Sequence, residues 1–294
     1  MKLDNVVITP KRITEKVNLF IIGVNKAGTT WLHGLLGEHP DVFMSSIKEL
    51  NYFGVLYPNG LEKYHQNFNF NLGLRYYGES STSYFRNPDV AEQINEYNPK
   101  TKVMVMLRDP VERLLSHFYF SKQLGEIPEK VTLEDILDNQ NHYMKRDSHY
   151  ECTIPKFENI FRHNFYVNRL EIALSNTEIF WSEILKYLSL SEVPLPEESK
   201  NSKNVTGGKG FRYIYRKTIL PIKKKKPDLY QSMLDSTFMK FSRKSLIDLF
   251  GKAEKDAISP TVKERLVQEF EETYRYLDSQ GLTWNRKVVD SKNL

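Results

Sequence analysis

Residues 19–35 (LFIIGVNKAGTTWLHGL) place a glycine loop between a short apolar run and a helical pattern, and they constrain the fold more than any other stretch. The apolar run predicts a buried strand, and the pattern after Gly28 predicts a helix. Such a loop directs backbone N–H groups and a helix N-terminus at one point, which favours a phosphate or sulfate. The spacing from Gly23 to Gly28 matches the Walker pattern GxxxxGK[ST], but Thr29 stands where that pattern has lysine, and the lysine is Lys26. The loop therefore predicts an anion cradle that differs from that of an ATPase.

A second anion site is predicted about eighty residues downstream. Residues 102–107 (KVMVML) have the pattern of a buried strand, which ends directly before Arg108. Asp109 suits the N-cap of the following helix, and Pro110 suits its first turn. Ser116 lies about two turns along that helix. A guanidinium at the strand end and a hydroxyl on the helix can converge on one phosphate.

Strands and helices alternate along the first half of the chain. Strand patterns occur at residues 19–24, 41–44, 76–79 and 102–107, and helical patterns at 29–38, 89–97 and 110–122. Helical patterns predominate in the second half, at residues 163–175, 180–188, 228–251 and 261–279. This order predicts an α/β fold with a P-loop-like central parallel sheet flanked by helices, with ligands at the carboxyl ends of the strands and a mainly helical C-terminal half. No linker-like stretch and no internal repeat divides the sequence, so we expect one domain over residues 1–294.

Five motifs in this order resemble those of the sulfotransferases that use 3′-phosphoadenosine 5′-phosphosulfate (PAPS), in particular the bacterial and glycosaminoglycan branches. They are the 5′-phosphosulfate loop from Lys26 to Thr30, the KExxFF-like segment from Lys48 to Phe53, the GEKSPxY-like segment from Gly78 to Phe85, the 3′-phosphate motif from Arg108 to Ser116, and the lysine-glycine loop from Lys209 to Tyr213. Because the five occur together over about 190 residues, they are far more specific than any one glycine loop.

The resemblance implies a reaction and a set of residues for it. An acceptor hydroxyl or amine attacks sulfur in line, and 3′,5′-ADP is the leaving product. Glu49 is implied as the general base, Lys26 as the group that stabilises the leaving phosphate, and Lys48 as a group that orients sulfate or the acceptor. The implied cofactor-binding residues are Lys26, Ala27, Gly28, Thr29, Thr30, Trp31, Arg108, Ser116, Lys209, Gly210 and Tyr213. No metal is expected, because a sulfuryl group carries less charge than a phosphoryl group and no HExxH, CxxC or DxD-like cluster lies beside the loop.

One segment departs from the pattern of the family. Members commonly have a strand that ends in an acidic motif before the helix that resembles ILKYLSL. Residues 174–182 leave little room for such a strand. We therefore expect a shortened or missing strand here, which affects the acceptor pocket and leaves the cofactor motifs unchanged.

Composition narrows the class of partner and the compartment. The net charge of +5 helps to attract an anionic nucleotide but is too small to indicate a nucleic-acid-binding protein. The single cysteine, Cys152, excludes an intramolecular disulfide and fits a reducing compartment. The sequence shows neither a signal peptide nor a membrane-spanning stretch, so we expect a cytoplasmic protein.

Two other functions remain open from the residues. A P-loop kinase or NTPase is disfavoured because Thr29 replaces the Walker lysine and because residues 102–107 are followed by arginine where a Mg²⁺-binding aspartate is expected. A non-catalytic binder of anionic polymers would use the same basic residues without turnover. For an enzyme, the acceptor is expected to be a small molecule or carbohydrate, or a lipid-like molecule, bound by the insertions at residues 54–75 and 123–165. The oligomeric state stays open, as does the role of the lysine run at residues 223–226.

Overall fold

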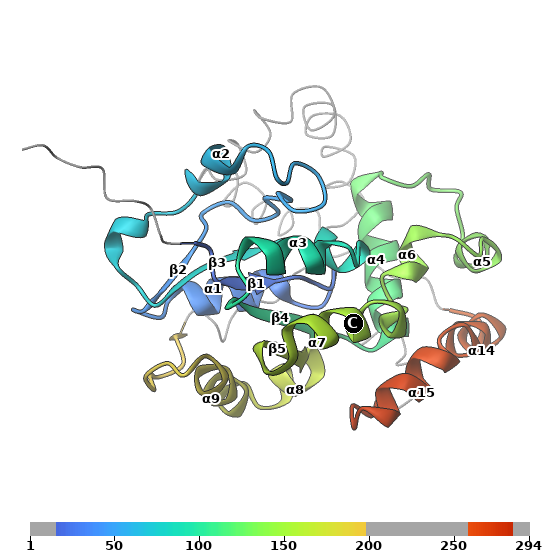
Figure 1. Cartoon of the computed structure of the whole chain (residues 1–294). Coiled ribbons are helices and arrows are strands. Elements are labelled where there is room, and N and C mark those ends of the chain that lie inside the picture. Colours follow the sequence, from blue (N-terminus) through green and yellow to red (C-terminus); the bar gives the residue numbers. More distant parts are fainter. Residues whose placement is uncertain (1–15, 198–257, 285–294) are drawn as a thin grey trace, which may run out of the picture.

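The computed structural model describes residues 16–197 and 258–284. Its centre is a parallel sheet with the strand order β2-β3-β1-β4-β5 (Figure 1). The strands are β1 (Leu19–Ile21), β2 (Val42–Met44), β3 (Tyr76–Ser80), β4 (Lys102–Leu107) and β5 (Phe165–Arg169). The predicted central parallel sheet is therefore confirmed, and the carboxyl ends of all five strands lie along the same edge.

Helices flank this sheet, and α3 and α7 pack side by side against one another (Figure 1). The α-helices are α1 (Thr29–Gly37), α2 (Leu61–His65), α3 (Val90–Tyr97), α4 (Pro110–Leu124), α5 (Leu133–Asp138), α6 (Tyr143–Arg146), α7 (Ile154–Phe161), α8 (Leu170–Ser175), α9 (Thr177–Leu188), α14 (Pro260–Glu269) and α15 (Glu271–Ser279). The 3₁₀ helices are η1 (Phe70–Leu72), η2 (Thr82–Arg86), η3 (Tyr150–Cys152) and η4 (Arg162–Asn164). The helices predicted at residues 29–38, 89–97 and 110–122 are confirmed to within two residues at each end.

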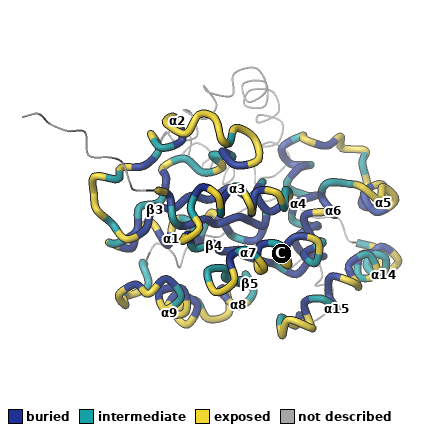
Figure 2. The backbone as a smooth tube through the Cα atoms, in the orientation of Figure 1, coloured by how far each residue is buried: buried dark blue, intermediate teal, exposed yellow. Residues whose placement is uncertain are grey.

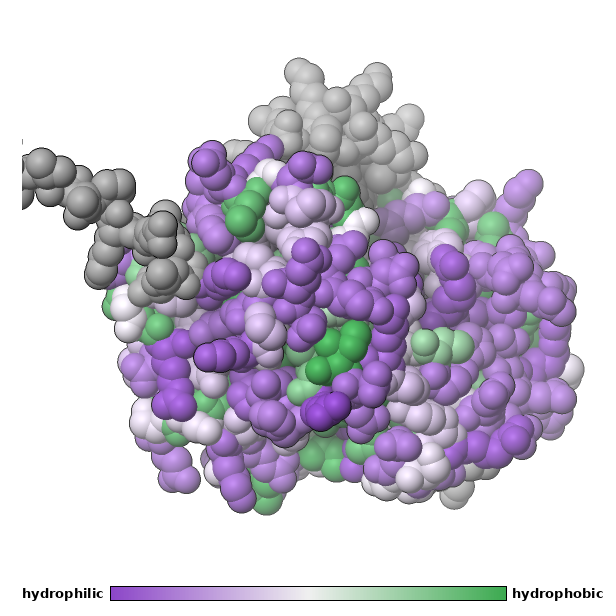
Figure 3. All heavy atoms as spheres, viewed as in Figure 1, coloured by the Kyte–Doolittle hydropathy of each residue, from purple (hydrophilic) through white to green (hydrophobic). Residues whose placement is uncertain are grey.

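The two central strands are apolar because both of their faces are covered. All three residues of β1 are buried, as are the last five of β4 (Figure 2). This burial on two faces explains why continuous apolar runs marked these strands in the sequence. Hydrophilic residues predominate on the face of the molecule shown in Figure 3. In the described ranges, no helix combines the length and the apolar character that crossing a membrane requires.

The strand predicted at residues 19–24 ends at Ile21, but the chain continues beside β4. Ile22 N–H donates to the Met104 carbonyl at 2.9 Å, and Val24 N–H donates to that of Met106 at 2.8 Å. Gly23 between them has φ +146°, and a Cβ atom there would lie only 2.9 Å from Cβ of Phe85. Glycine therefore permits the backbone to turn out of the sheet toward the loop.

The sequence interpretation of residues 163–175 as one helix is wrong, because β5 occupies the first part of this stretch and α8 the second. β5 pairs in parallel with β4 from Phe165 opposite Val103 to Arg169 opposite Leu107. Its aromatic and β-branched residues suit a strand at the edge of a sheet, where burial is incomplete. The expected loss of a strand near residues 174–182 is wrong as well, since the strand lies before α8.

The remaining helical predictions divide into three cases. The pattern at residues 180–188 belongs to a longer helix, α9, which begins at Thr177 because Asn176 caps it. The pattern at residues 261–279 forms two helices, α14 and α15, which are separated at the fully buried Phe270. The pattern at residues 228–251 lies outside the described residues.

Candidate active site

The glycine loop between β1 and α1 has the geometry of an anion cradle. Lys26 and Gly28 both adopt a left-handed backbone conformation, with φ of +73° and +82°. Gly28 is the N-cap of α1 and provides no side-chain acceptor for the first turn, which contains Thr29, Thr30 and Trp31. The first N–H groups of a helix have no acceptor within it, so this turn can donate hydrogen bonds to an anion.

Two arginines that follow β4 donate hydrogen bonds to the backbone of the glycine loop. The Arg108 guanidinium donates to the Lys26 carbonyl at 3.4 Å, and the Arg113 guanidinium donates to the Asn25 carbonyl at 3.5 Å. The ammonium group of Lys26 lies 3.5 Å from the centre of the Phe120 ring on α4. The two anion motifs that the sequence predicted separately are therefore in direct contact.

Arg113 is a supporting residue for which the sequence analysis gave no role. Its guanidinium is wholly buried, and it donates to the Ser148 hydroxyl and to the Met144 carbonyl. Asp147 supplies the counter-charge at 3.7 Å, and this carboxylate also accepts two hydrogen bonds of 2.8 Å from Arg86. Because both partners of this ion pair are buried, Arg113 is held rigidly where it contacts the loop.

Lys48 and Glu49 meet the first turn of α1. The ammonium group of Lys48 donates to the Thr29 and Thr30 hydroxyls at 3.2 and 3.3 Å, and it lies 3.7 Å from the Glu49 carboxylate. Burial lowers the pKa of Lys48, and the neighbouring charge of Glu49 opposes this effect. The structure thus brings a cation and a carboxylate, from a segment that follows β2, to the anion cradle that follows β1.

The Glu49 carboxylate is oriented by Thr82 at the start of η2. Thr82 N–H donates to Glu49 Oε2 at 2.8 Å, and the Thr82 hydroxyl donates to the same oxygen at 3.1 Å. The Glu49 side chain is still 40% exposed, so its carboxylate is open to a ligand. Thr82 was not identified from the sequence, because its main contribution is a backbone N–H group that any residue other than proline carries.

Comparison with known proteins assigns the chain to a family. A family model described as "Sulfotransferase domain" matches residues 16–192, which is more than half of the chain. The chain belongs to the sulfotransferase family. The fold agrees, because a sulfotransferase from Alicyclobacillus acidocaldarius superposes with a TM-score of 0.65 over 92% of this chain and 98% of that one, at 18% sequence identity.

Two curated relatives show the extent of the likeness in sequence. Membrane-associated sulfotransferase kil1 of Dictyostelium discoideum is 38% identical over 109 residues, which are 36% of this chain and 23% of that protein. Heparan sulfate glucosamine 3-O-sulfotransferase 5 of Mus musculus is 33% identical over 100 residues, which are 33% of this chain and 29% of that protein. The matched region thus spans less than a third of either relative.

The segment from Arg108 to Ser116, for which the sequence analysis predicted a 3′-phosphate site, begins at the carboxyl end of β4. Asp109 caps α4, because its carboxylate accepts a hydrogen bond of 2.9 Å from Glu112 N–H. Arg108 lies 3.5 Å from the Glu112 carboxylate, and Ser116 is half-buried further along α4. Tyr274 of α15 donates to the second oxygen of Asp109 at 2.8 Å, so a C-terminal helix supports this motif. The other predicted cofactor residues, Lys209, Gly210 and Tyr213, lie outside the described residues.

A carboxylate that the sequence analysis left without a role lies at the end of β3. Glu79 is completely buried and accepts hydrogen bonds from the hydroxyls of Tyr64, Ser81 and Tyr84, at 2.8, 2.8 and 2.7 Å. Burial raises the pKa of Glu79 to about 7, although the three hydroxyls oppose this effect. A glutamate at this position in the sequence gives no sign of burial, so only the structure reveals the cluster.

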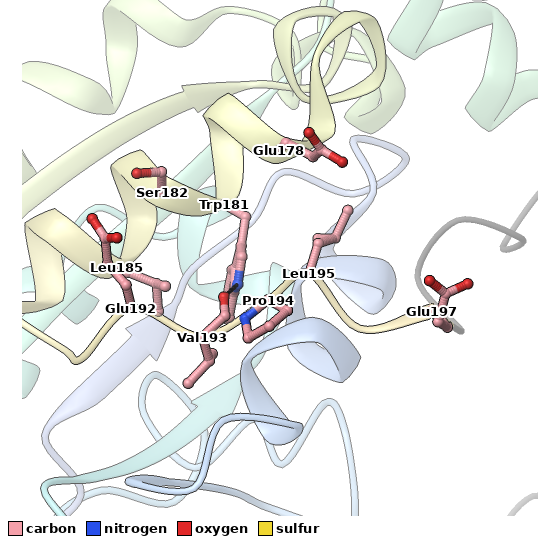
Figure 4. A pocket seen from close by; sticks show the side chains of 9 residues that line it. All are labelled: Glu178, Trp181, Ser182, Leu185, Glu192, Val193, Pro194, Leu195 and Glu197. Atoms are coloured by element: carbon pink, nitrogen blue, oxygen red, sulfur yellow. Dashed lines mark hydrogen bonds between the residues drawn. The ribbon is translucent and has the colours of Figure 1, made fainter.

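A surface groove lies between α9 and residues 192–197, and none of the predicted site residues lines it (Figure 4). Its lining residues are Glu178, Trp181, Ser182, Leu185, Glu192, Val193, Pro194, Leu195 and Glu197. The three carboxylates would repel an anionic nucleotide, so we do not assign the groove to the cofactor. Among the residues that the structure describes, no group of three or more His, Cys, Asp or Glu side chains is arranged to hold a metal ion.

Proposed function

We propose that this protein transfers a sulfuryl group from PAPS to a hydroxyl or amine of a carbohydrate or lipid-like acceptor. The observation that carries the proposal is the meeting of Lys48 and Glu49 with Thr29 and Thr30 at the first turn of α1. A base and a cation beside an anion cradle are what an in-line transfer between two oxygens needs.

The residues present fit the donor, which carries an anionic group at each end of its ribose. The loop from Lys26 to Thr30 would hold the 5′-phosphosulfate with backbone N–H groups and the Lys26 ammonium. Arg108 and Ser116 would hold the 3′-phosphate. A contact of 3.4 Å already joins Arg108 to the Lys26 carbonyl, so the two halves are at a distance that one nucleotide can span.

The chemistry requires one proton acceptor and stabilisation of the departing charge. PAPS, when bound, supplies the sulfuryl group. Glu49 takes the proton from the acceptor hydroxyl as the acceptor oxygen forms its bond to sulfur. The bond between sulfur and the 5′-phosphate oxygen breaks, and its electron pair leaves with 3′,5′-ADP. Lys26 and the first turn of α1 neutralise the charge on the departing 5′-phosphate. Lys48 binds the oxygens of the sulfuryl group as it passes from this phosphate to the acceptor.

The acceptor class rests on the relatives and on the residues near Glu49. The name of one relative contains heparan sulfate glucosamine, and this acceptor is a carbohydrate. Asn51 and Ser83 place an amide and a hydroxyl beside Glu49, and Val55 and Leu56 are exposed on the loop that follows. Polar groups near Glu49, with exposed apolar side chains a few residues further along the chain, suit a sugar with an apolar substituent or a lipid-like hydroxyl.

The first experiment is calorimetric titration of the protein with 3′,5′-ADP, beside ADP with Mg²⁺, followed by transfer of labelled sulfate from PAPS to a panel of sugars and lipid alcohols. We expect 3′,5′-ADP to bind without Mg²⁺, the wild type to label an acceptor, and Glu49→Gln to keep nucleotide binding while losing most turnover. Binding of Mg-ADP alone would overturn the proposal in favour of a kinase. Binding of anionic polymers with no turnover on any acceptor would favour a non-catalytic binder.

A further inference from the structure

We propose that Glu79, as a buried carboxylate, is the positioning residue for the segment that carries Glu49, and that it acts through Ser81 and Tyr84. This inference rests on the proposed role of Glu49. The Glu79 carboxylate accepts hydrogen bonds from Tyr64, Ser81 and Tyr84, which are not among the predicted cofactor-binding or catalytic residues.

Two hydrogen-bond chains lead from Glu79 to the backbone of this segment. Ser81 donates its hydroxyl proton to Glu79 Oε2 at 2.8 Å and accepts Asn51 N–H at 3.1 Å. Tyr84 donates to Glu79 Oε1 at 2.7 Å and accepts Phe53 N–H at 3.3 Å. Both chains therefore end on backbone N–H groups within four residues of Glu49.

The segment needs such anchors because its backbone is strained. Glu49 and Asn51 adopt φ of +60° and +52°, a conformation that costs about 1–3 kcal/mol for residues other than glycine. The Asn51 amide donates to the Glu49 carbonyl at 2.6 Å, so a shift at Asn51 moves Glu49 as well. Without the two anchors, the bond from Glu49 N–H to the Ser80 carbonyl, at 2.9 Å, and the Thr82 contacts still hold Glu49, but Asn51 and Phe53 lose their N–H acceptors. We expect the segment to sample negative φ more often and to move the carboxylate relative to Lys48.

The charge state of Glu79 determines which group donates and which accepts along both hydrogen-bond chains. An ionised carboxylate only accepts hydrogen bonds, so each hydroxyl must point its proton at Glu79 and leave its lone pairs to an N–H group. A neutral acid or an amide donates one hydrogen bond and forces one hydroxyl to reverse. The ionisable groups around Glu79 are the phenols of Tyr64 on α2, Tyr84 on η2 and Tyr97 on α3, and the charge of Glu49 also acts on it.

The structure provides a matched pair of variants for the test. Tyr64 and Tyr84 both donate to Glu79 Oε1, at 2.8 and 2.7 Å, but only Tyr84 continues to the backbone at Phe53. Tyr64→Phe and Tyr84→Phe each delete one buried hydroxyl from the same oxygen. Tyr84→Phe should lower kcat about 10-fold to 100-fold with KM for PAPS unchanged, because a displacement of about 1 Å has an effect of that size. Tyr64→Phe should keep kcat within about twofold.

Amide hydrogen exchange of residues 49–53 provides a readout that does not depend on turnover. We expect faster exchange in Tyr84→Phe, Ser81→Ala and Glu79→Gln, and the wild-type rate in Tyr64→Phe. Equal effects of Tyr64→Phe and Tyr84→Phe, on exchange or on kcat, would overturn the inference and leave Glu79 a structural residue. If Glu49→Gln retains full turnover, the proposed function of Glu49 fails, while the exchange data still decide whether Glu79 holds the segment.

Discussion

Replacement of Glu79 by glutamine should change how the stability of the protein depends on pH. The carboxyl has an ordinary pKa of 4.5, and burial raises the pKa of Glu79 to about 7 in the folded protein. Between these values the folded state keeps a proton that the unfolded state has lost. The free energy of unfolding therefore falls as pH rises, with the contribution fully present below pH 4.5 and lost above about pH 7.

The size of this change in the free energy of unfolding follows from the pH range between the two pKa values. Each pH unit in which only one state holds the proton is equivalent to about 1.4 kcal/mol, so the whole window corresponds to about 3 kcal/mol. The assay is urea unfolding of the wild type and of Glu79→Gln at several values between about pH 5 and pH 8. Other titrating groups cancel when the free energy of unfolding of the variant is subtracted from that of the wild type.

We expect this difference to fall by about 2–3 kcal/mol from the acidic to the alkaline end of the range. A difference that stays constant would refute the argument, since Glu79 would then titrate alike in both states. A difference that rises with pH would refute it too, since the pKa of Glu79 would then be lower in the folded state than in the unfolded state. The result would also show a conflict between stability and function, because the ionised form that orients Ser81 and Tyr84 is the form that destabilises the fold.

Three further predictions test the site and its support. Gly28→Ala should weaken 3′,5′-ADP binding at least about tenfold, because φ is +82° and the new methyl group would lie 2.8 Å from Leu170; unchanged affinity in calorimetry would contradict the cradle. Asp147→Asn should lower the free energy of unfolding by about 3–5 kcal/mol in urea, because Arg113 keeps a buried charge without its counter-charge; a loss below about 1 kcal/mol would mean that water reaches Arg113. Lys48→Met should lower kcat about 100-fold to 1,000-fold while 3′,5′-ADP affinity stays within about threefold; wild-type turnover would remove Lys48 from the reaction.

The sequence predicted the elements whose residues all have the same surroundings, such as strands that are buried on both faces, and the elements that neighbouring residues mark locally. β1 and β4 are covered on both faces and are therefore continuously apolar, and Asp109 with Pro110 marks the start of α4 by local chemistry alone. β5 was missed because an edge strand is half-buried, and its pattern merges with that of the helix that follows. Residue order alone could not show that the chain needs a strand at this position.

The candidate site divides along a similar line. Lys26, Lys48, Glu49 and Arg108 belong to short motifs, so the sequence could predict them as site residues. In the structure Lys48 contacts Thr29 and Glu49, and Arg108 contacts the Lys26 carbonyl. Support from Thr82 and Glu79 could not be predicted in the same way. It depends on backbone N–H groups and on complete burial, which arise only when segments distant in the sequence pack together.

The contact between Tyr274 and Asp109 also determines when this fold can be completed on the ribosome. These two residues are 165 positions apart in the sequence, and Glu269 reaches Lys145 on α6 from the same pair of C-terminal helices. At about 5–20 residues per second, translation needs roughly 8 to 30 seconds to add that length. Once residue 169 has been added, all five strands have been synthesised, while Asp109 at the start of α4 still lacks Tyr274. The contact between α15 and the start of α4 can therefore form only after all five strands have been synthesised, and a nascent chain that stalls before α15 lacks it.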